Sequence, residues 1–161
     1  MNALVVYYSR TGRTRKMAEE IASALSADFE ELRDNKKRSG PLGFIMSGIE
    51  ARSGRTVNLE PLSHDPATYD VVVVGTPVWA STMSSPVRTF LQETDLSKGR
   101  VAWFCTAGSN DQDMHAGCFN AMHEETGLTP VATIGFGAGS LKRDHAEAIT
   151  NFAAVVKNAA G

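Results

Sequence analysis

The stretch LVVYYSRTGRT, residues 4–14, joins an apolar run to a turn that is rich in hydroxyl groups. Residues 4–8 predict a buried strand, and apolar residues at spacings of four predict a helix over about residues 13–27. The turn therefore lies where a strand passes directly into a helix. The free N–H groups and the dipole of a helix start favour a bound anion at this place.

The chemistry of this turn suits a phosphate group. Gly12 lets the backbone approach a ligand closely, and the Ser and Thr side chains supply hydroxyl donors. We expect the whole turn to hold the phosphate: Ser9, Arg10, Thr11, Gly12, Arg13 and Thr14. The alternative is that these Ser and Thr residues only form the turn and cap the helix.

The rest of the chain alternates strands and helices. Apolar runs at residues 71–74, 101–105 and 131–136 predict buried parallel strands, and the more polar residues 29–32 predict an edge strand. Helical patterns follow Pro86, cover residues 113–125, and form a final stripe of Ala146, Ile149, Phe152, Ala153 and Val156. This order predicts a three-layer, doubly wound α/β fold with five parallel strands in one domain, residues 1–161.

Charge and composition exclude several classes of protein. The net charge of −2 and the pI near 6.1 leave no electrostatic footprint for nucleic acid. We expect no signal peptide after Met1, no membrane span of ~20 apolar residues, and a cytoplasmic location. Cys105 and Cys118 fit neither a disulfide framework nor a zinc site, and Cys105 is expected to be an inert buried thiol. No metal-ligand spacing relates the histidines: His64, His115, His123 and His145.

The connection over residues 34–69 is long for an α/β protein. Residues 41–51 predict a short amphipathic helix with Phe44, Ile45 and Ile49 buried. This segment is either a plain crossover helix with a long return, or a flap or subunit contact near the ligand. The oligomeric state, monomer or homodimer, is left open.

Two further loops follow strands of the predicted sheet, at residues 75–83 and 106–111. Ligands of open α/β sheets bind beyond the carboxyl ends of the strands, where the strand order reverses. These loops are rich in Gly, Ser and Thr, and the first carries Trp79. With the turn at residues 9–14, they offer a phosphate cradle, a large aromatic face and a set of backbone donors.

These features resemble the flavodoxin family over nearly the whole chain. Ser9, Thr11, Gly12 and Thr14 match the family's phosphate signature, [ST]-x-T-G-x-T, and residues 75–91 resemble its second FMN loop. The resemblance implies non-covalently bound FMN and the strand order 2-1-3-4-5, which makes the polar residues 29–32 an edge strand. In family members a glycine often follows the aromatic residue of this loop, whereas Ala80 and Ser81 stand here.

The resemblance also implies roles for the two later loops. Trp79 is expected to cover the isoalloxazine ring, with a core or interface position as the alternative. Thr76 shapes its loop or contacts the ribityl chain, and the backbone of residues 106–111 meets the pyrimidine edge unless it is only a surface turn. The predicted ligand-binding residues of these loops are Thr76, Pro77, Val78, Trp79, Ala80, Thr106, Ala107, Gly108, Ser109 and Asp111. No catalytic side chain is predicted, because the flavin itself does the reacting.

Three functions fit this sequence. The first is an electron carrier that shuttles electrons between a reductase and an acceptor protein, and the short chain favours it. The second is an FMN-dependent NAD(P)H oxidoreductase for quinones or other small acceptors. The low acidity and the placement of Arg38, Arg52 and Arg55 beside a Gly-rich segment keep this second function open. The third is a flavin-binding regulatory module without turnover.

Overall fold

The computed structural model describes residues 1–139 and 145–161. A parallel sheet with the order β2-β1-β3-β5-β6 forms its centre. The strands are β1 (Ala3–Tyr7), β2 (Asp28–Glu31), β3 (Val71–Trp79), β5 (Arg100–Thr106) and β6 (Thr133–Phe136). Apart from the short β4, this order is the predicted 2-1-3-4-5, so the doubly wound α/β class is confirmed.

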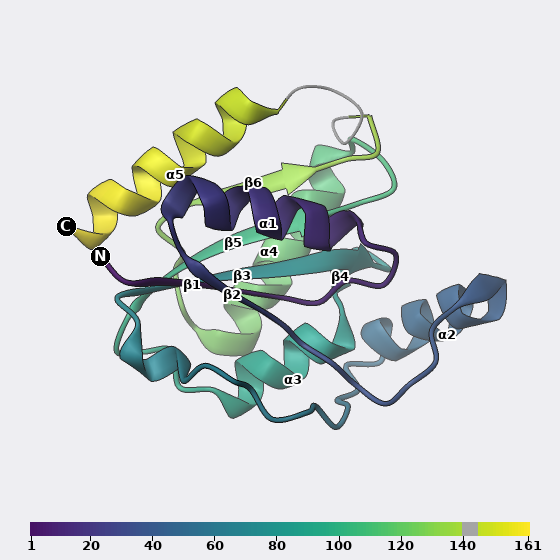
Figure 1. Ribbon diagram of the computed structural model, residues 1–161. Coiled ribbons are helices and arrows are strands. Elements are labelled where there is room, and N and C mark those ends of the chain that lie inside the picture. Colours follow the sequence, from purple (N-terminus) through teal and green to yellow (C-terminus); the bar gives the residue numbers. More distant parts are fainter. Residues whose placement is uncertain (140–144) are drawn as a thin grey trace.

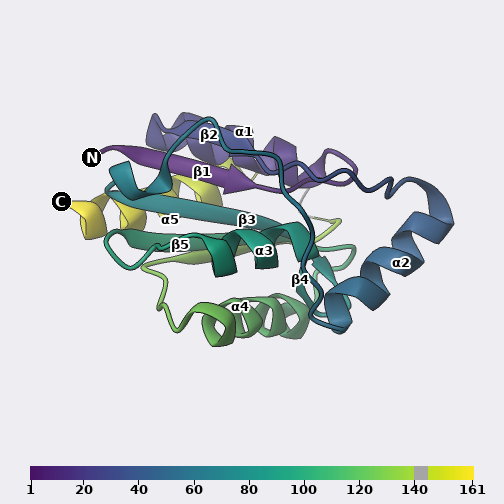
Figure 2. The same ribbon diagram turned by 90° about the horizontal axis from the view of Figure 1, so that it is seen from below.

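Helices cover both faces of the sheet (Figures 1 and 2). One layer contains α1 (Arg13–Leu25) and α5 (Ala146–Ala160), and the other contains α3 (Ser85–Glu93) and α4 (Gln112–Thr126). Alternate residues of a strand enter the two layers: Val5 packs with the α1 side, and Leu4 packs with the α3 side. Both faces are therefore buried, which explains why the strands read as continuous apolar runs.

The strand β2 lies at the edge of the sheet, as its polarity predicts. Within the part of the chain that the structure describes it pairs only with β1, and Phe29 is 47% exposed. A strand with one neighbour and a partly solvated face does not need a continuous apolar sequence.

The sequence predicts a loop over residues 75–83, but most of this segment belongs to strands. The prediction of a loop is therefore wrong here. The strand β3 continues through Trp79 and turns back as the antiparallel strand β4 (Thr82–Met83). Ala80 and Ser81 connect the two strands with φ values of 50° and 62°. Two residues with positive φ suit a type I′ hairpin, whose twist matches that of the flanking strands. A loop of the binding edge is thus a rigid hairpin.

The helix α2 (Gly40–Arg52) projects beyond the carboxyl ends of the strands instead of lying on a face of the sheet (Figure 2). The predicted burial of Phe44, Ile45 and Ile49 is wrong, because their exposed fractions are 61%, 56% and 53%. The chain returns from α2 to β3 through the short 3-10 helix η1 (Pro66–Thr68). The helix α2 thus lies in the crossover between the parallel strands β2 and β3 and is followed by a long return, but it does not cover a face of the sheet.

Candidate ligand-binding site

The phosphate turn lies between β1 and α1. Gly12 precedes the helix with a φ of 90°, and apart from its chain neighbours no atom of the described residues lies within 4 Å of the position that a Cβ would take. The Ser9 hydroxyl accepts a hydrogen bond of 3.0 Å from the Gly12 N–H, which fixes the turn. No side chain of the described residues caps α1, which leaves the N–H groups of its first turn without a side-chain partner there and suited to an anion. The exposed Thr11, Gly12 and Arg13 are at the surface where such an anion would bind.

Thr14 links the phosphate turn to the end of β5. Its hydroxyl lies 2.8 Å from the hydroxyl of Thr106, and both residues are buried. Each hydroxyl has further capacity for hydrogen bonding, since a hydroxyl donates one bond and accepts two. The turn and the loop after β5 are therefore held together before any ligand is present.

Thr76 closes the hairpin. Its hydroxyl accepts a hydrogen bond of 3.0 Å from the Ser84 N–H and lies 2.9 Å from the carbonyl oxygen of Pro77. Thr76 is fully buried. This arrangement supports the expected role of Thr76 in shaping the loop.

Trp79 lies in the hydrophobic core beneath the site and is 5% exposed. Tyr8 meets it edge to face at 5.6 Å between ring centroids, and the guanidinium of Arg38 lies over its ring at 5.0 Å. Burial and the charge of Asp34 raise the pKa of Tyr8 to about 12, so its phenol stays protonated beside Trp79. Part of the indole surface is thus already covered by the protein itself.

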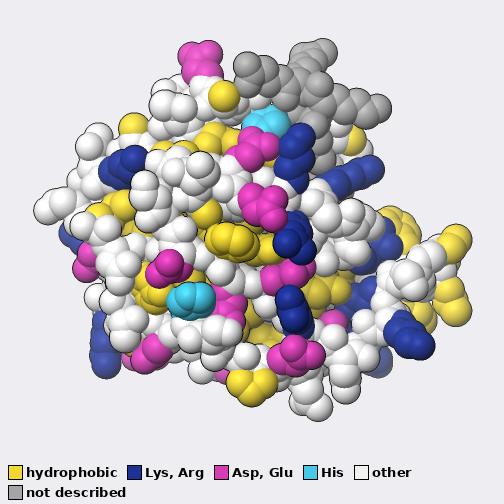
Figure 3. All heavy atoms as spheres, viewed as in Figure 1, with side chains coloured by type: hydrophobic (Ala, Val, Ile, Leu, Met, Phe, Trp, Pro, Cys, Tyr) yellow, Lys and Arg dark blue, Asp and Glu magenta, His cyan; other side chains and the backbone are white. Residues whose placement is uncertain are grey.

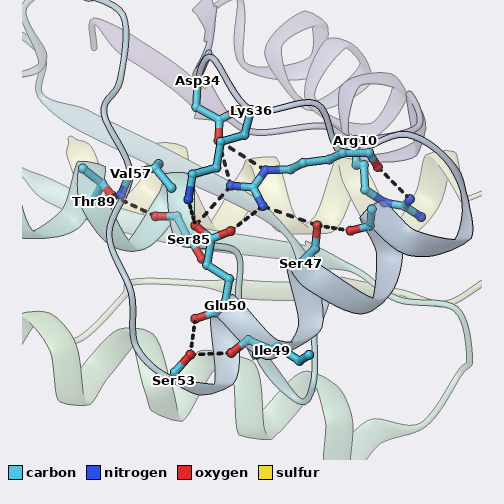
Figure 4. A network of polar contacts seen from close by, with 12 residues as sticks. Arg10, Asp34, Lys36, Ser47, Ile49, Glu50, Ser53, Val57, Ser85 and Thr89 are labelled. Atoms are coloured by element: carbon cyan, nitrogen blue, oxygen red, sulfur yellow. Dashed lines mark hydrogen bonds and ion pairs between the residues drawn. The ribbon is translucent and has the colours of Figure 1, made fainter.

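A buried ion-pair network holds Arg38 in place, and Figure 4 labels its other members, Asp34, Lys36 and Glu50. Its guanidinium donates to Asp34 at 2.7 Å and to Glu50 of α2 at 2.8 Å, and Lys36 also donates to Glu50 at 2.8 Å. Burial alone lowers the pKa of Arg38, but the hydrogen bonds to Glu50 and Asp34 outweigh it, so the pKa is raised. Arg38 is therefore a permanent internal cation and is not free to bind an external phosphate together with Arg52.

The network also fixes α2 relative to the phosphate turn. Arg10 donates a hydrogen bond of 3.3 Å to the carbonyl oxygen of Arg38, and its guanidinium lies 5.2 Å from the ring centroid of Phe44. Gly43 permits close packing, because a Cβ there would lie 2.5 Å from the carbonyl carbon of Arg38. The turn, the segment before α2 and α2 itself form one connected structure.

The loop after β5 is anchored at both ends. The Ala107 N–H donates to the carbonyl oxygen of Phe136 at 2.8 Å. Asp111 accepts a hydrogen bond of 2.9 Å from the Asp113 N–H and caps α4. Between these anchors, Gly108 and Ser109 are exposed. Asp111 thus has a structural role, and the exposed part of the loop is the part that can meet a ligand.

A pocket of about 610 Å³ brings the loops and α2 together. Its predicted members are Val78, Trp79, Ala80, Gly108 and Ser109. Sequence reasoning did not assign its other members to the site: Phe44, Ile45, Gly48, Ile49 and Arg52 of α2, and Met114 of α4. The sequence of α2 does contain a signal for these residues. The helix has more apolar residues than one buried face can hold, so some of them must lie elsewhere, for example at a pocket. The other predicted ligand-binding residues do not line this pocket: Ser9, Arg10, Thr11, Gly12, Arg13, Thr14, Thr76, Pro77, Thr106, Ala107 and Asp111.

The remaining candidate residues have structural surroundings. Cys105 and Cys118 are both buried, and the hydrogen bond with Cys105 together with burial raises the pKa of the Cys118 thiol. Among the described residues, no group of three or more acidic, His or Cys side chains is placed to hold a metal ion. Within the same residues, no helix is long and apolar enough to cross a membrane.

The fold and this site define the class of protein: a doubly wound α/β protein with an exposed turn between its first strand and first helix, and an apolar pocket lined by α2, the β3–β4 hairpin, the loop after β5 and α4. The family model for flavodoxin matches residues 2–133. The chain therefore belongs to the flavodoxin family. A comparison with curated protein sequences finds no significant match.

Solved structures share the fold. A flavoprotein from Lactobacillus acidophilus NCFM in complex with FMN has a TM-score of 0.71 and 23% identity, over 83% of this chain and 92% of that chain. A protein from Bacteroides eggerthii DSM 20697 has a TM-score of 0.79 and 20% identity, over 97% and 98% of the two chains. The flavodoxin of Streptococcus pneumonia TIGR4 has a TM-score of 0.65 and 15% identity, over 99% of both chains.

Proposed function

We propose that this protein binds FMN and works as an electron carrier between redox partner proteins. The observation that carries the proposal is the junction of two features at the carboxyl ends of β1, β3 and β5. One is a helix start with available N–H groups, and the other is an apolar pocket whose lining residue Phe44 contacts Arg10 of the phosphate turn. A phosphate attached to a flat ring system needs both. Membership of the flavodoxin family and the FMN complex of the L. acidophilus protein support this assignment.

Different segments of the chain would bind different parts of FMN. The backbone of the phosphate turn, with the hydroxyl of Thr11, would hold the phosphate, while the side chains of Ser9 and Thr14 keep the turn in shape. The hairpin at Val78–Ala80 and the exposed Gly108 and Ser109 would enclose the ring. When bound, FMN supplies the ability to accept and donate electrons. The protein contributes orientation and exclusion of water.

Replacement of Gly12 by Val tests the phosphate assignment. A β-branched residue is strained at a φ of 90°, and its side chain would occupy the open space where the phosphate binds. We expect FMN affinity, measured by quenching of flavin fluorescence, to fall at least tenfold. Thr11→Ala should weaken binding as well.

Gly127→Val is a matched control for the strain. Gly127 has a φ of 68° and is exposed, and among the described residues beyond its chain neighbours no atom lies within 4 Å of the position of an added Cβ, but it ends α4 away from the site. This variant should bind FMN as the wild type does. Equal affinities of Gly12→Val and wild type would remove the phosphate turn from the proposal.

The alternative function is an FMN-dependent NAD(P)H oxidoreductase, and the open pocket with Arg52 at its wall is the observation that favours it. Mixing the FMN-loaded protein with NADH or NADPH without oxygen separates the two functions. We expect the flavin absorbance to bleach only when a reductase protein is added, as an electron carrier requires. Rapid bleaching by NADH or NADPH alone would instead establish the oxidoreductase.

A further inference from the structure

The helix α2 presents a polar side to the body of the protein and apolar side chains to the outside. The residues buried against the body are Ser47, Glu50 and Ala51. The large apolar side chains of the helix are each more than half exposed: Leu42, Phe44, Ile45, Met46 and Ile49. Figure 3 shows hydrophobic side chains gathered where α2 projects from the body. A surface helix of a globular protein normally has the reverse arrangement.

Most of these exposed side chains form one regular face. Leu42, Ile45, Met46 and Ile49 follow the i, i+3, i+4, i+7 spacing, which places them on one side of the helix. We call these four residues the outward face. Helices use this pattern to bury an apolar stripe against a neighbour, but here the stripe is exposed. Leu42 and Met46 do not line the pocket, so the outward face extends beyond the proposed ligand site.

Ion pairs on the body side of α2 keep the outward face exposed. Glu50 accepts from Lys36 and from Arg38, each at 2.8 Å. A rotation of α2 that buried the outward face would break both pairs and leave charged groups in the interior without their partner, which is costly. The exposure of these apolar side chains is therefore built into the structure.

Positive charge surrounds the outward face. Residues 35–59 contain five Lys or Arg residues and one acidic residue, Glu50, although the whole chain has a net charge of −2. Lys37 precedes α2, Arg52 ends it and Arg55 follows it, and all three are exposed. Among the described residues, none of these three forms an ion pair. Unpaired cations thus flank the apolar face at both ends of the helix.

We propose that α2 attaches the protein to an anionic phospholipid membrane. The outward face would enter the boundary between headgroups and acyl chains, with Lys37, Arg52 and Arg55 among the lipid phosphates. The helix lies on the bilayer and does not cross it, because 13 residues extend over only ~20 Å and the hydrocarbon core is ~30 Å thick. An apolar helix face with cations beside it is the combination that binds such surfaces. This inference goes beyond the proposed binding of FMN and does not depend on it.

Charge and size favour a membrane over a protein as the occupant of this face. A two-fold dimer brings the same patch of both copies together, so Arg52 and Arg55 would meet the cations of the second copy. A stable contact with another protein involves roughly 20–30 residues on each side. The outward face has four apolar side chains on one projecting helix (Figure 2). A bilayer adapts to a projecting helix and needs no preformed groove.

Flotation of the full chain with lipid vesicles tests the inference. The vesicles contain phosphatidylcholine with about one third phosphatidylglycerol, and the measurement is made with and without FMN. We expect saturable binding that weakens as the salt concentration rises and that is weak on phosphatidylcholine alone. Leu42→Ser should lower the vesicle affinity about tenfold, because it removes a large apolar side chain from the outward face. Val155→Ser on α5 changes another exposed apolar residue, 48% exposed, and should have no effect.

The contribution of charge is tested separately. Lys37→Gln should lower the affinity for the same vesicles about fivefold, the usual effect of one cation near an anionic membrane. Lys98→Gln is the matched control, since Lys98 is also exposed but precedes β5 at the opposite end of the sheet. Neither Leu42 nor Lys37 lines the pocket, so both variants should bind FMN as the wild type does.

The outcomes separate this inference from the proposed function. Absence of vesicle binding by the wild type, or equal vesicle affinity of Leu42→Ser and wild type, overturns the membrane site alone. Failure to bind FMN with vesicle binding intact overturns only the proposed function. Dimerisation without lipid that Leu42→Ser abolishes would assign the outward face to a second copy and overturn the membrane site. Binding to poly-glutamate in place of vesicles would assign it to an acidic protein and overturn the membrane site as well.

Discussion

At the scale of single residues, Arg38 makes the contacts that matter most for the shape of the site. It is 7% exposed, forms ion pairs with Asp34 and Glu50, and lies over the ring of Trp79. A buried cation requires such partners, because an unpaired charge in the interior is costly. One side chain thus joins the floor of the pocket to the helix that forms its outer wall.

Replacing Arg38 by Met should release α2 locally. The change leaves the carboxylates of Asp34 and Glu50 without their main cation, and breaking a buried pair in this way costs at least about 3 kcal/mol. We expect the amides of α2 to exchange with solvent roughly a hundredfold faster in native-state hydrogen exchange. The amides of α1 should exchange at unchanged rates.

Arg55→Met serves as the control for this experiment, since Arg55 is an exposed arginine that follows the same helix. It should leave exchange in α2 as it is in the wild type. Unchanged exchange in Arg38→Met would mean that the network does not hold the helix. Arg38→Lys keeps the charge but loses the planar fork, and it should give an intermediate rate.

At the scale of elements, the phosphate turn and α2 show which structural features a local sequence pattern can predict and which it cannot. The turn is predictable because its signature is contained in six consecutive residues between a strand and a helix. The range of α2 is also predictable from Pro41 and the glycines that flank the segment. The direction in which its apolar side faces cannot be predicted from the sequence. It depends on ion pairs that Lys36 and Arg38 form with Glu50 of α2 in the folded protein, and on the pairing of Arg38 with Asp34.

The hairpin at Trp79 is a second feature that the local sequence does not predict. Ala80 and Ser81 carry no glycine or asparagine signal for a type I′ turn, so the sequence indicates only a loop. The pairing of Val78 with Met83 and of Trp79 with Thr82 forces the positive φ values. Likewise, Asp111 is equally plausible from sequence as a ligand contact or a helix cap, and the structure uses it as a cap.

At the scale of the whole molecule, the alternation of patterns predicts the doubly wound class and the resemblance to the flavodoxin family implies the strand order, whereas neither predicts the pocket. Its walls come from α2, the β3–β4 hairpin, the loop after β5 and α4. No single window of sequence contains that combination. The conformation of the turn at Gly12 can be predicted because one loop contains its signature, whereas the contribution of α2 to the pocket depends on a distant helix.

The stability of the whole molecule should decrease on both sides of neutral pH. Burial raises the pKa of Tyr7 and of Tyr8 to about 12, so their contribution is complete below pH ~10 and is lost as the pH rises toward 12. Burial opposes ionisation of Glu30 and Glu50, but their hydrogen bonds outweigh it and lower both pKa values. Their contribution is complete above pH ~4.3 and is lost as the pH falls further.

His115 should add a decline at milder acidity. Its ring is 5% exposed, and its Nε2 has no hydrogen-bond partner among the described residues. Burial lowers its pKa, although Asp111 partly opposes the shift, so the unfolded chain binds a proton that the folded chain resists. Stability is complete above the unfolded pKa of about 6.5 and falls as the pH decreases, by at most ~1.4 kcal/mol per pH unit. Urea unfolding of wild type and His115→Leu between pH 7.5 and 5 should show this slope in the wild type and a flatter profile in the variant, and equal slopes would assign the decline to other groups.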